Sequence, residues 1–179
     1  MGKTHHHFGR QQTPRSKKSS DMTEHKFDEI DLRILRVLQL NARGTNTQVG
    51  KEAGITQAPT LRRTKLMEAR GIIRGYHAVL ESRMLGFDVM VFNQVALRSQ
   101  ASKSLGEFEA AMAGIPNVRE CHALAGKFDF LLKCVFRDLA EAHSFVVGVL
   151  QKLENVESVT TAFCIRVTKN ESEVPLVAE

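Results

Sequence analysis

Residues 54–78, GITQAPTLRRTKLMEARGIIRGYHA, decide how this chain is organised. Gly54 suits a tight turn, and Thr56 can cap a helix by accepting a hydrogen bond from a first-turn N–H. Pro59 falls within that first turn, where its missing N–H costs little. The helix should end at Arg70-Gly71, because glycine is the usual residue just past a helix end. The following run, residues 72–80, is predicted to be a strand.

A second helix is expected just before this stretch, over residues 46–53. Helix, tight glycine turn and helix then follow one another closely, which is typical of a helix-turn-helix, whose second helix enters the DNA major groove. A further amphipathic helix is predicted over residues 27–40, because apolar residues recur there at helical spacing: Phe27, Ile30, Ile34, Leu35 and Leu38. The pattern indicates a helical DNA-binding domain over residues 27–80.

Charge is distributed unevenly along the chain. Residues 27–80 hold nine basic and five acidic residues, a net charge of +4, whereas residues 81–179 hold ten basic and thirteen acidic, a net charge of −3. A basic region attracts phosphates and an acidic one does not, so nucleic acid is expected to contact the first region. A merely solvated basic surface is the alternative interpretation.

Several other functions are disfavoured by composition. The three cysteines, Cys121, Cys134 and Cys164, lack metal-ligand spacing and predict free, buried thiols in a reducing compartment, with no metal site and no cofactor. No window is long and apolar enough to span a membrane, so a soluble, cytoplasmic and nucleoid-associated protein is expected. Residues 1–26 are polar and basic and predict a disordered tail, within which His5-His6-His7 resembles an added tag or a chance run. A basic arm that contacts DNA phosphates is the alternative for this tail.

The second half of the chain alternates strand and helix patterns. After a linker at residues 81–87, the pattern reads strand, helix, strand, strand, helix and strand over residues 88–168, and residues 169–179 are expected to be a tail. This βαββαβ order predicts a ferredoxin-like domain and an α+β fold class for the whole chain, with a winged-helix-like helix-turn-helix domain first. Its antiparallel sheet carries helices on one face only, so the face holding Val159, Phe163 and Ile165, or its opposite, needs a cover. A second subunit related by two-fold symmetry is the simplest cover.

Four motifs in this order resemble the Lrp/AsnC, or feast/famine, family of transcription regulators. They are FDEIDLRILRVLQLNAR at 27–43 with the helix-turn-helix that follows, ARGIIRGYHAVLESRMLGF at 69–87, AGKFDFLLKCVFRD at 125–138 and VESVTTAFCIRV at 156–167. The resemblance implies a homodimer with paired sheets, and dimers that often assemble into rings or octamers. It also implies a small effector, commonly an amino acid, bound between subunits near a GxxD turn.

Candidate DNA-binding residues lie on the outward, N-terminal part of the predicted reading helix: Gln57, Ala58, Arg62, Arg63 and Lys65. Arg62 could bind guanine with two hydrogen bonds and Gln57 could read adenine. Arg63 and Lys65 could equally hold phosphates, which fix the register without reading sequence. The alternative is that these are solvated positions or partners of Glu68. Tyr76, on the following run, is expected to be a packed aromatic residue.

Candidate effector-binding residues lie in the GxxD turn, which here reads Gly126-Lys127-Phe128-Asp129, with Thr161 as a weaker candidate on the last strand. Gly126 permits a positive φ and a close approach of a ligand to the backbone. Asp129 could accept hydrogen bonds from an ammonium group. The competing interpretation is a simple β-turn whose aspartate satisfies local amides.

Two other classes of protein are alternative interpretations of the sequence. Some siroheme decarboxylases are similar to this family in fold, but residues 74–78, RGYHA, lack the second arginine of their usual motif, so an enzyme is not expected. An amino-acid-sensing module without DNA binding is the other, and the basic reading helix argues against it. The sequence therefore predicts a DNA-binding regulator of double-stranded DNA that responds to a small effector.

Overall fold

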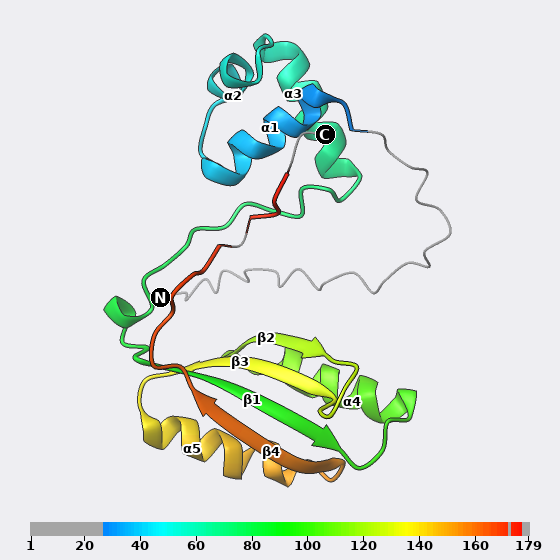
Figure 1. Cartoon of the computed structure of the whole chain (residues 1–179), viewed down its shortest axis with the longest axis vertical. Helices are drawn as coiled ribbons and strands as arrows, with labels where there is room; N and C mark the ends of the chain where they lie inside the picture. The colour runs from blue at the N-terminus through cyan, green and yellow to red at the C-terminus, as the bar shows by residue number, and fades with distance from the viewer. Residues whose placement is uncertain (1–26, 172, 177–179) are drawn as a thin grey trace, which may run out of the picture. The chain divides into compact units, whose positions relative to one another are not determined.

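The computed structural model describes residues 27–171 and 173–176. Its described residues divide into two compact units, one with residues 27–77 and 173–176, and the other with residues 78–171 (Figure 1). The boundary predicted after Leu80 thus falls three residues earlier, and residues 81–87 belong to the second unit. The predicted disorder of residues 1–26 concerns a part of the chain outside the described residues.

The first unit contains three helices, as predicted. They are α1 (Glu29–Leu40), α2 (Asn46–Ala53) and α3 (Gln57–Ala69). Asp28 caps α1 and forms a capping box with Asp31, and Thr45 does the same for α2 with Gln48. The three helices pack around a small apolar core: Ile34, Val49, Ala53 and Met67.

The turn between α2 and α3 depends on two glycines. Gly54 ends α2 with φ 79°, a left-handed conformation that favours glycine. A Cβ on Gly50 would lie 2.6 Å from Oγ1 of Thr60 and 2.8 Å from the carbonyl oxygen of Ile55, so the two helices approach closely only because that side chain is missing. Thr56 is the N-cap residue of α3, but its side chain makes no capping hydrogen bond, which corrects the predicted contact. Its carbonyl oxygen instead accepts from the hydroxyl of Thr60 at 2.8 Å.

The strand predicted over residues 72–80 is wrong. Ile72 and Ile73 are half-buried against the helical core, and residues 74–81 are extended backbone that pairs with no other described segment. A strand requires a hydrogen-bonded neighbouring strand. The apolar residues that suggested a strand here have other locations. Two isoleucines cover the helices, and the side chain of Val79 is left 91% exposed.

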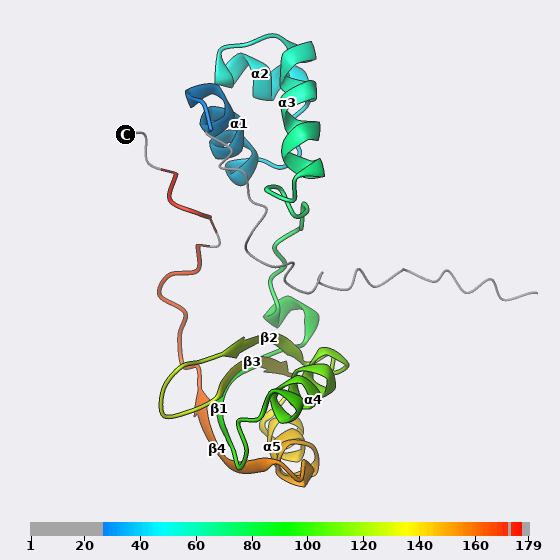
Figure 2. The ribbon, with the colours of Figure 1, turned by 90° about the vertical axis from the view of Figure 1, so that its right-hand side faces the viewer.

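The second unit has the predicted βαββαβ order. Its elements are η1 (Arg83–Leu85), β1 (Val89–Leu97), α4 (Ser102–Ala113), β2 (Val118–Ala123), β3 (Phe130–Phe136), α5 (Leu139–Gly148), η2 (Leu150–Lys152) and β4 (Val156–Phe163). The sheet is antiparallel with strand order β2-β3-β1-β4, the arrangement of a ferredoxin-like fold. Both helices lie on one face of the sheet (Figure 2), which confirms the predicted fold class.

Strand register decides which sheet face is uncovered. Val95 pairs with Val159 and Val91 with Phe163, and the two valines of β1 are fully buried in the core beneath the helices. The face with Val159 and Phe163 is therefore the covered one, and its opposite holds the half-buried Phe92 together with Gln94, Leu131 and Lys133. Strand β4 ends at Phe163, so Ile165, which was predicted to share a strand face with Val159 and Phe163, lies beyond the strand and is 92% exposed.

Candidate nucleic-acid interface and effector site

The outward face of α3 carries most of the predicted DNA-binding residues. Thr60, Thr64 and Met67 are buried and fix which side of the helix faces the core. The opposite side is exposed and holds four of the five candidates together with Leu61: Gln57, Ala58, Arg62 and Lys65. This stripe offers an amide, a guanidinium and an ammonium group on one helix face, the groups that contact base edges and phosphates.

Arg63, the fifth candidate, is turned toward α1. Its Nη1 lies 2.7 Å from Oδ2 of Asp28 and 2.7 Å from Oδ1 of Asp31, and its side chain is 24% exposed. The backbone N–H of Asp31 is the main cause that lowers the pKa of Asp28, with a further contribution from Arg63. The same two carboxylates, Asp31 first, raise the pKa of the arginine. Arg63 therefore links the middle of the reading helix to the N-terminus of α1.

Glu68, near the end of α3, is contacted by the segment that follows the helix. The hydroxyl of Tyr76 donates a 2.9 Å hydrogen bond to its Oε1. Burial first, and then this carboxylate, raises the pKa of Tyr76 to about 12. The contact joins the end of α3 to the segment that follows it, and Tyr76 remains 44% exposed. Tyr76 is thus half-packed rather than a buried aromatic residue.

Asp129 of the GxxD turn is engaged by neighbouring protein groups. Its Oδ2 accepts the backbone N–H of Leu97 at 2.7 Å, and its Oδ1 accepts Nε2 of Gln100 at 2.8 Å. Its own N–H donates to the carbonyl oxygen of Val95 at 2.9 Å. These bonds join the start of β3 to the end of β1, the geometry that the alternative interpretation of a local turn describes. Each carboxylate oxygen still has a second lone pair available for a ligand.

Of the other turn residues, Gly126 and Lys127 are exposed and Phe128 is half-buried. Gly126 does not adopt the positive φ that a glycine permits, and an added Cβ would meet nothing within 4 Å, so the backbone there is open to approach. The Nζ of Lys127 lies 5.5 Å from the centre of the Phe128 ring, an exposed cation–π contact. This part of the turn offers free backbone groups and one ammonium group.

Thr161 lies farther into the sheet. Its hydroxyl donates a 2.7 Å hydrogen bond to Oδ1 of the fully buried Asn93, on the face covered by the helices. The amide of Asn93 in turn contacts Sγ of Cys134 at 3.6 Å. The structure brings Gly126, Lys127, Phe128 and Asp129 together in one turn and gives Thr161 a structural partner in the core.

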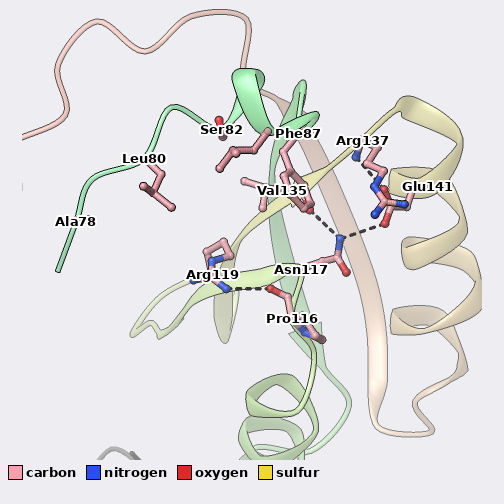
Figure 3. A pocket seen from close by; sticks show the side chains of 11 residues that line it. Ala78, Leu80, Ser82, Phe87, Pro116, Asn117, Arg119, Val135, Arg137 and Glu141 are labelled. Carbon is pink, nitrogen blue, oxygen red and sulfur yellow. Dashed lines mark hydrogen bonds between the residues drawn. The ribbon is translucent and has the colours of Figure 1, made fainter. Parts of the chain in front are cut away.

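Sequence reasoning missed a cavity at the opposite end of the β2–β3 pair from the GxxD turn. It has a volume of about 570 Å³, and its wall combines aliphatic side chains of residues 78–87 with polar groups near the start of β2 and the end of β3 (Figure 3). Asn117 donates to the carbonyl oxygen of Val135 at 2.9 Å and to Oε1 of Glu141 at 3.2 Å. Arg119 and Arg137 also line the cavity. Its lining comes from several segments that are far apart in the sequence, so no local motif predicts the cavity.

The cysteines only partly fit the predicted buried thiols. Cys134 is buried, Cys164 is half-buried and Cys121 is exposed, and all three are free. Burial is the main cause that raises the pKa of Cys134 to about 11, which keeps this thiol protonated at neutral pH. Within residues 27–171 and 173–176, no three His, Cys, Asp or Glu side chains gather as a metal site would require. In the same part of the chain, no helix has the length and apolar character needed to cross a bilayer.

Comparison with known proteins agrees with both units. Residues 27–74 match the winged helix-turn-helix DNA-binding family, and residues 90–174 match the Lrp/AsnC ligand-binding domain. A leucine-responsive regulatory protein of Rhizobium meliloti is 40% identical over 151 residues, which cover 84% of this chain and 97% of that protein. A proline dehydrogenase transcriptional activator of Rhodobacter capsulatus is 36% identical over 135 residues, 75% of this chain and 88% of that one.

Solved structures give the same result. A transcriptional regulator of Neisseria meningitidis, crystallised with L-Met, superimposes with a TM-score of 0.80 at 32% identity and covers 84% of this chain and 97% of its own. An AsnC family transcriptional regulator of Agrobacterium tumefaciens follows at a TM-score of 0.78 and 30% identity, with the same coverage. Fold and relatives define a DNA-binding transcriptional regulator with a ligand-binding domain. The chain belongs to the Lrp/AsnC family, as the sequence motifs predicted.

Proposed function

We propose that this regulator is not an enzyme and that it reads double-stranded DNA as a homodimer through α3, with Gln57, Ala58, Arg62 and Lys65 in the major groove. The exposed stripe on α3 is the observation that carries this proposal. Arg62 is the candidate for guanine, because a guanidinium can donate two hydrogen bonds to one base edge. Arg63 orients α3 through Asp28 and Asp31 and makes at most a secondary phosphate contact. The protein then acts in the cytoplasm, on the nucleoid.

The test is DNA binding by fluorescence anisotropy, on the DNA upstream of its own gene and on random DNA. Arg62→Ala should weaken specific binding by about 1–3 kcal/mol and affect random DNA less. Lys103→Ala removes the same charge from an exposed position on α4, so it is the matched control and should leave both affinities unchanged. An equal loss on both DNAs would instead make Arg62 a phosphate contact.

The ligand of the second unit is proposed to be an amino acid bound at the GxxD turn, between subunits. The open backbone of residues 126–128 and the ammonium group of Lys127 suit the carboxylate end of an amino acid. The remaining lone pairs of Asp129 suit its ammonium end. L-Met, the ligand of the Neisseria relative, is the first candidate. A thermal-shift screen of the twenty amino acids tests this, followed by DNA binding with each hit.

Lys127→Ala provides a sharper variant than a change at Asp129, because it keeps the hydrogen bonds that the Asp129 side chain makes to Leu97 and Gln100. It should weaken the response to the amino acid and leave ligand-free DNA binding intact. The matched control is Lys152→Ala, an exposed lysine of η2. A full response in Lys127→Ala, or no small molecule that changes DNA affinity, would contradict the proposed effector site.

The homodimer is proposed because the second unit leaves apolar surface without a neighbour. The uncovered sheet face holds Phe92 and Leu131, and two extended segments expose Val79 and Ile165 almost fully. A partner subunit can cover the sheet face and can pair with the extended segments, which have unused backbone donors and acceptors. Light scattering should give at least a dimer at micromolar concentration. A monomer would refute this, and a larger ring would extend it.

A further inference from the structure

Residues 173–176 lie against α1 of the first unit. The side-chain amide of Gln39 makes two hydrogen bonds with the backbone of Val174: its Oε1 accepts from the N–H at 2.7 Å, and its Nε2 donates to the carbonyl oxygen at 3.1 Å. One turn earlier on the helix, Nε of Arg36 donates to the carbonyl oxygen of Leu176 at 3.0 Å. Paired donation and acceptance of this kind is what an adjacent β-strand offers to an extended segment.

The sequences of both partners suit this contact. Pro175 separates the two recognised residues, favours extended backbone and has no N–H that would need an acceptor. Arg36 and Gln39 are three residues apart and therefore share one side of α1. Oε1 of Glu29 lies 3.6 Å from Nη1 of Arg36, which holds the guanidinium in place. Recognition uses the backbone, so the Val174 side chain is left 63% exposed while Leu176 is half-buried.

The chain passes between the two units twice because of this contact. It leaves the first unit after His77 and returns to it at Glu173. Without the contact at Val174 and Leu176, one covalent connection would join the units and the helices would have more orientational freedom. Two reading helices must meet half-sites at a fixed spacing. Orientational freedom that the helices lose on binding DNA has an entropic cost, which lowers the affinity.

We propose that Arg36 and Gln39 form a docking site for residues 173–176 of the same chain, and that this docking reduces the conformational freedom that the helix-turn-helix unit loses when it binds DNA. The inference rests on the proposed reading of DNA by α3. Arg36, Gln39 and residues 173–176 would then influence the affinity for DNA although they contact neither the DNA nor the effector.

The test compares the full chain, Gln39→Ala, and a chain ended after Glu171. Each change should lower the affinity for specific DNA by roughly three- to tenfold, because Gln39→Ala removes two exposed hydrogen bonds and the shortened chain lacks these two and the bond from Arg36. Gln39→Ala in the shortened chain should cause no further loss, because both changes remove the same contact. Leu40→Ala is the matched control, since this neighbouring side chain is 84% exposed, and it should leave DNA binding unchanged.

A structural readout accompanies the affinities. The amide resonance of Val174 in the full chain should report a hydrogen-bonded proton, and Gln39→Ala should move it to its position in an unstructured peptide. Unchanged DNA affinity in the shortened chain would overturn the proposal. So would an equal effect of Gln39→Ala with and without residues 172–179, because Gln39 would then act independently of the segment.

Mixed dimers test whether the segment docks on its own chain. A dimer of one Gln39→Ala chain and one shortened chain has no intact docking site if docking is within the chain, and it should bind DNA as weakly as either parent. If the segment crosses to the partner, one site survives, and an intermediate affinity would refute docking within the chain. Failure of the unaltered protein to bind DNA would count against the proposed function, whereas normal binding by every variant would count against docking alone.

Discussion

Replacing Arg63 tests whether this arginine stabilises the first unit or contacts DNA. In Arg63→Ala, α3 loses two 2.7 Å charge-assisted contacts to Asp28 and Asp31. The Asp28 side chain is about half exposed, so water screens that contact and its loss costs well under about 1 kcal/mol. Asp31 is 6% exposed, and a charged hydrogen bond to such a carboxylate contributes about 1.5–3 kcal/mol. The expected loss of unfolding free energy is therefore about 2 kcal/mol for the first unit.

Urea unfolding followed by circular dichroism measures this loss, and Arg62→Ala is the control. Arg62 is exposed on the same helix, so its removal should change stability by no more than about 0.5 kcal/mol. The salt dependence of DNA binding supplies the second measurement, because each phosphate contact contributes about 0.9 to the slope of log K against log salt. Arg63→Ala should leave that slope unchanged. A slope reduced by about one per reading helix, with unaltered stability, would refute the structural role and make Arg63 a phosphate contact.

Three further changes test other contacts. The hydroxyl oxygen of Thr64 is buried without a hydrogen-bond partner among the described residues, so Thr64→Val should raise the unfolding free energy by about 1 kcal/mol, and a lower value in urea unfolding would contradict this. Asp129→Ala leaves the N–H of Leu97 without its acceptor and should destabilise the second unit by about 1–3 kcal/mol even without ligand, measured as a fall in the thermal midpoint; an unchanged midpoint would show that the carboxylate does not stabilise the turn. The pKa of Asp28 is lowered by folding, so its contribution to stability is present above the ordinary value of 3.8 and is lost as pH falls through the lowered pKa. Asp28→Asn should flatten the loss of stability in that acidic range, and an identical pH profile would exclude the contribution.

Local signals in the sequence were sufficient for the elements themselves. Helix α3 runs from Gln57 to Ala69, as the positions of Pro59 and Gly71 indicated, and alternation in residues 88–168 predicted the strand and helix order of the second unit. These features depend on neighbours a few residues away, where propensity and periodicity carry the information. The outward stripe on α3 followed for the same reason.

Long-range contacts were not accessible in the same way. The apolar spacing of residues 72–80 fits a strand, but nothing in it says whether a partner segment exists. In the sequence Arg63 is one more basic residue of α3. The structure places it beside Asp28, thirty-five residues earlier in the chain. The sequence suggests a ligand residue at Asp129, but its carboxylate accepts from Leu97 at the end of β1 and from Gln100 just after the strand. In each case the deciding group lies on another element of the fold.

Antiparallel pairing of β1 and β4 has a consequence for the order in which the molecule assembles. Val91 near the start of β1 lies opposite Phe163 at the end of β4, so the chain enters and leaves the sheet at neighbouring points. The second unit is thus an insertion within the sequence of the first, and its folding brings Val91 and Phe163 side by side. In the unfolded chain the same approach would have to close a long loop, whose entropic penalty grows with the logarithm of its length. The entropic penalty for bringing residues 173–176 to α1 is therefore small only after the sheet has formed. We expect that contact to form late in folding and to be lost early when the sheet opens.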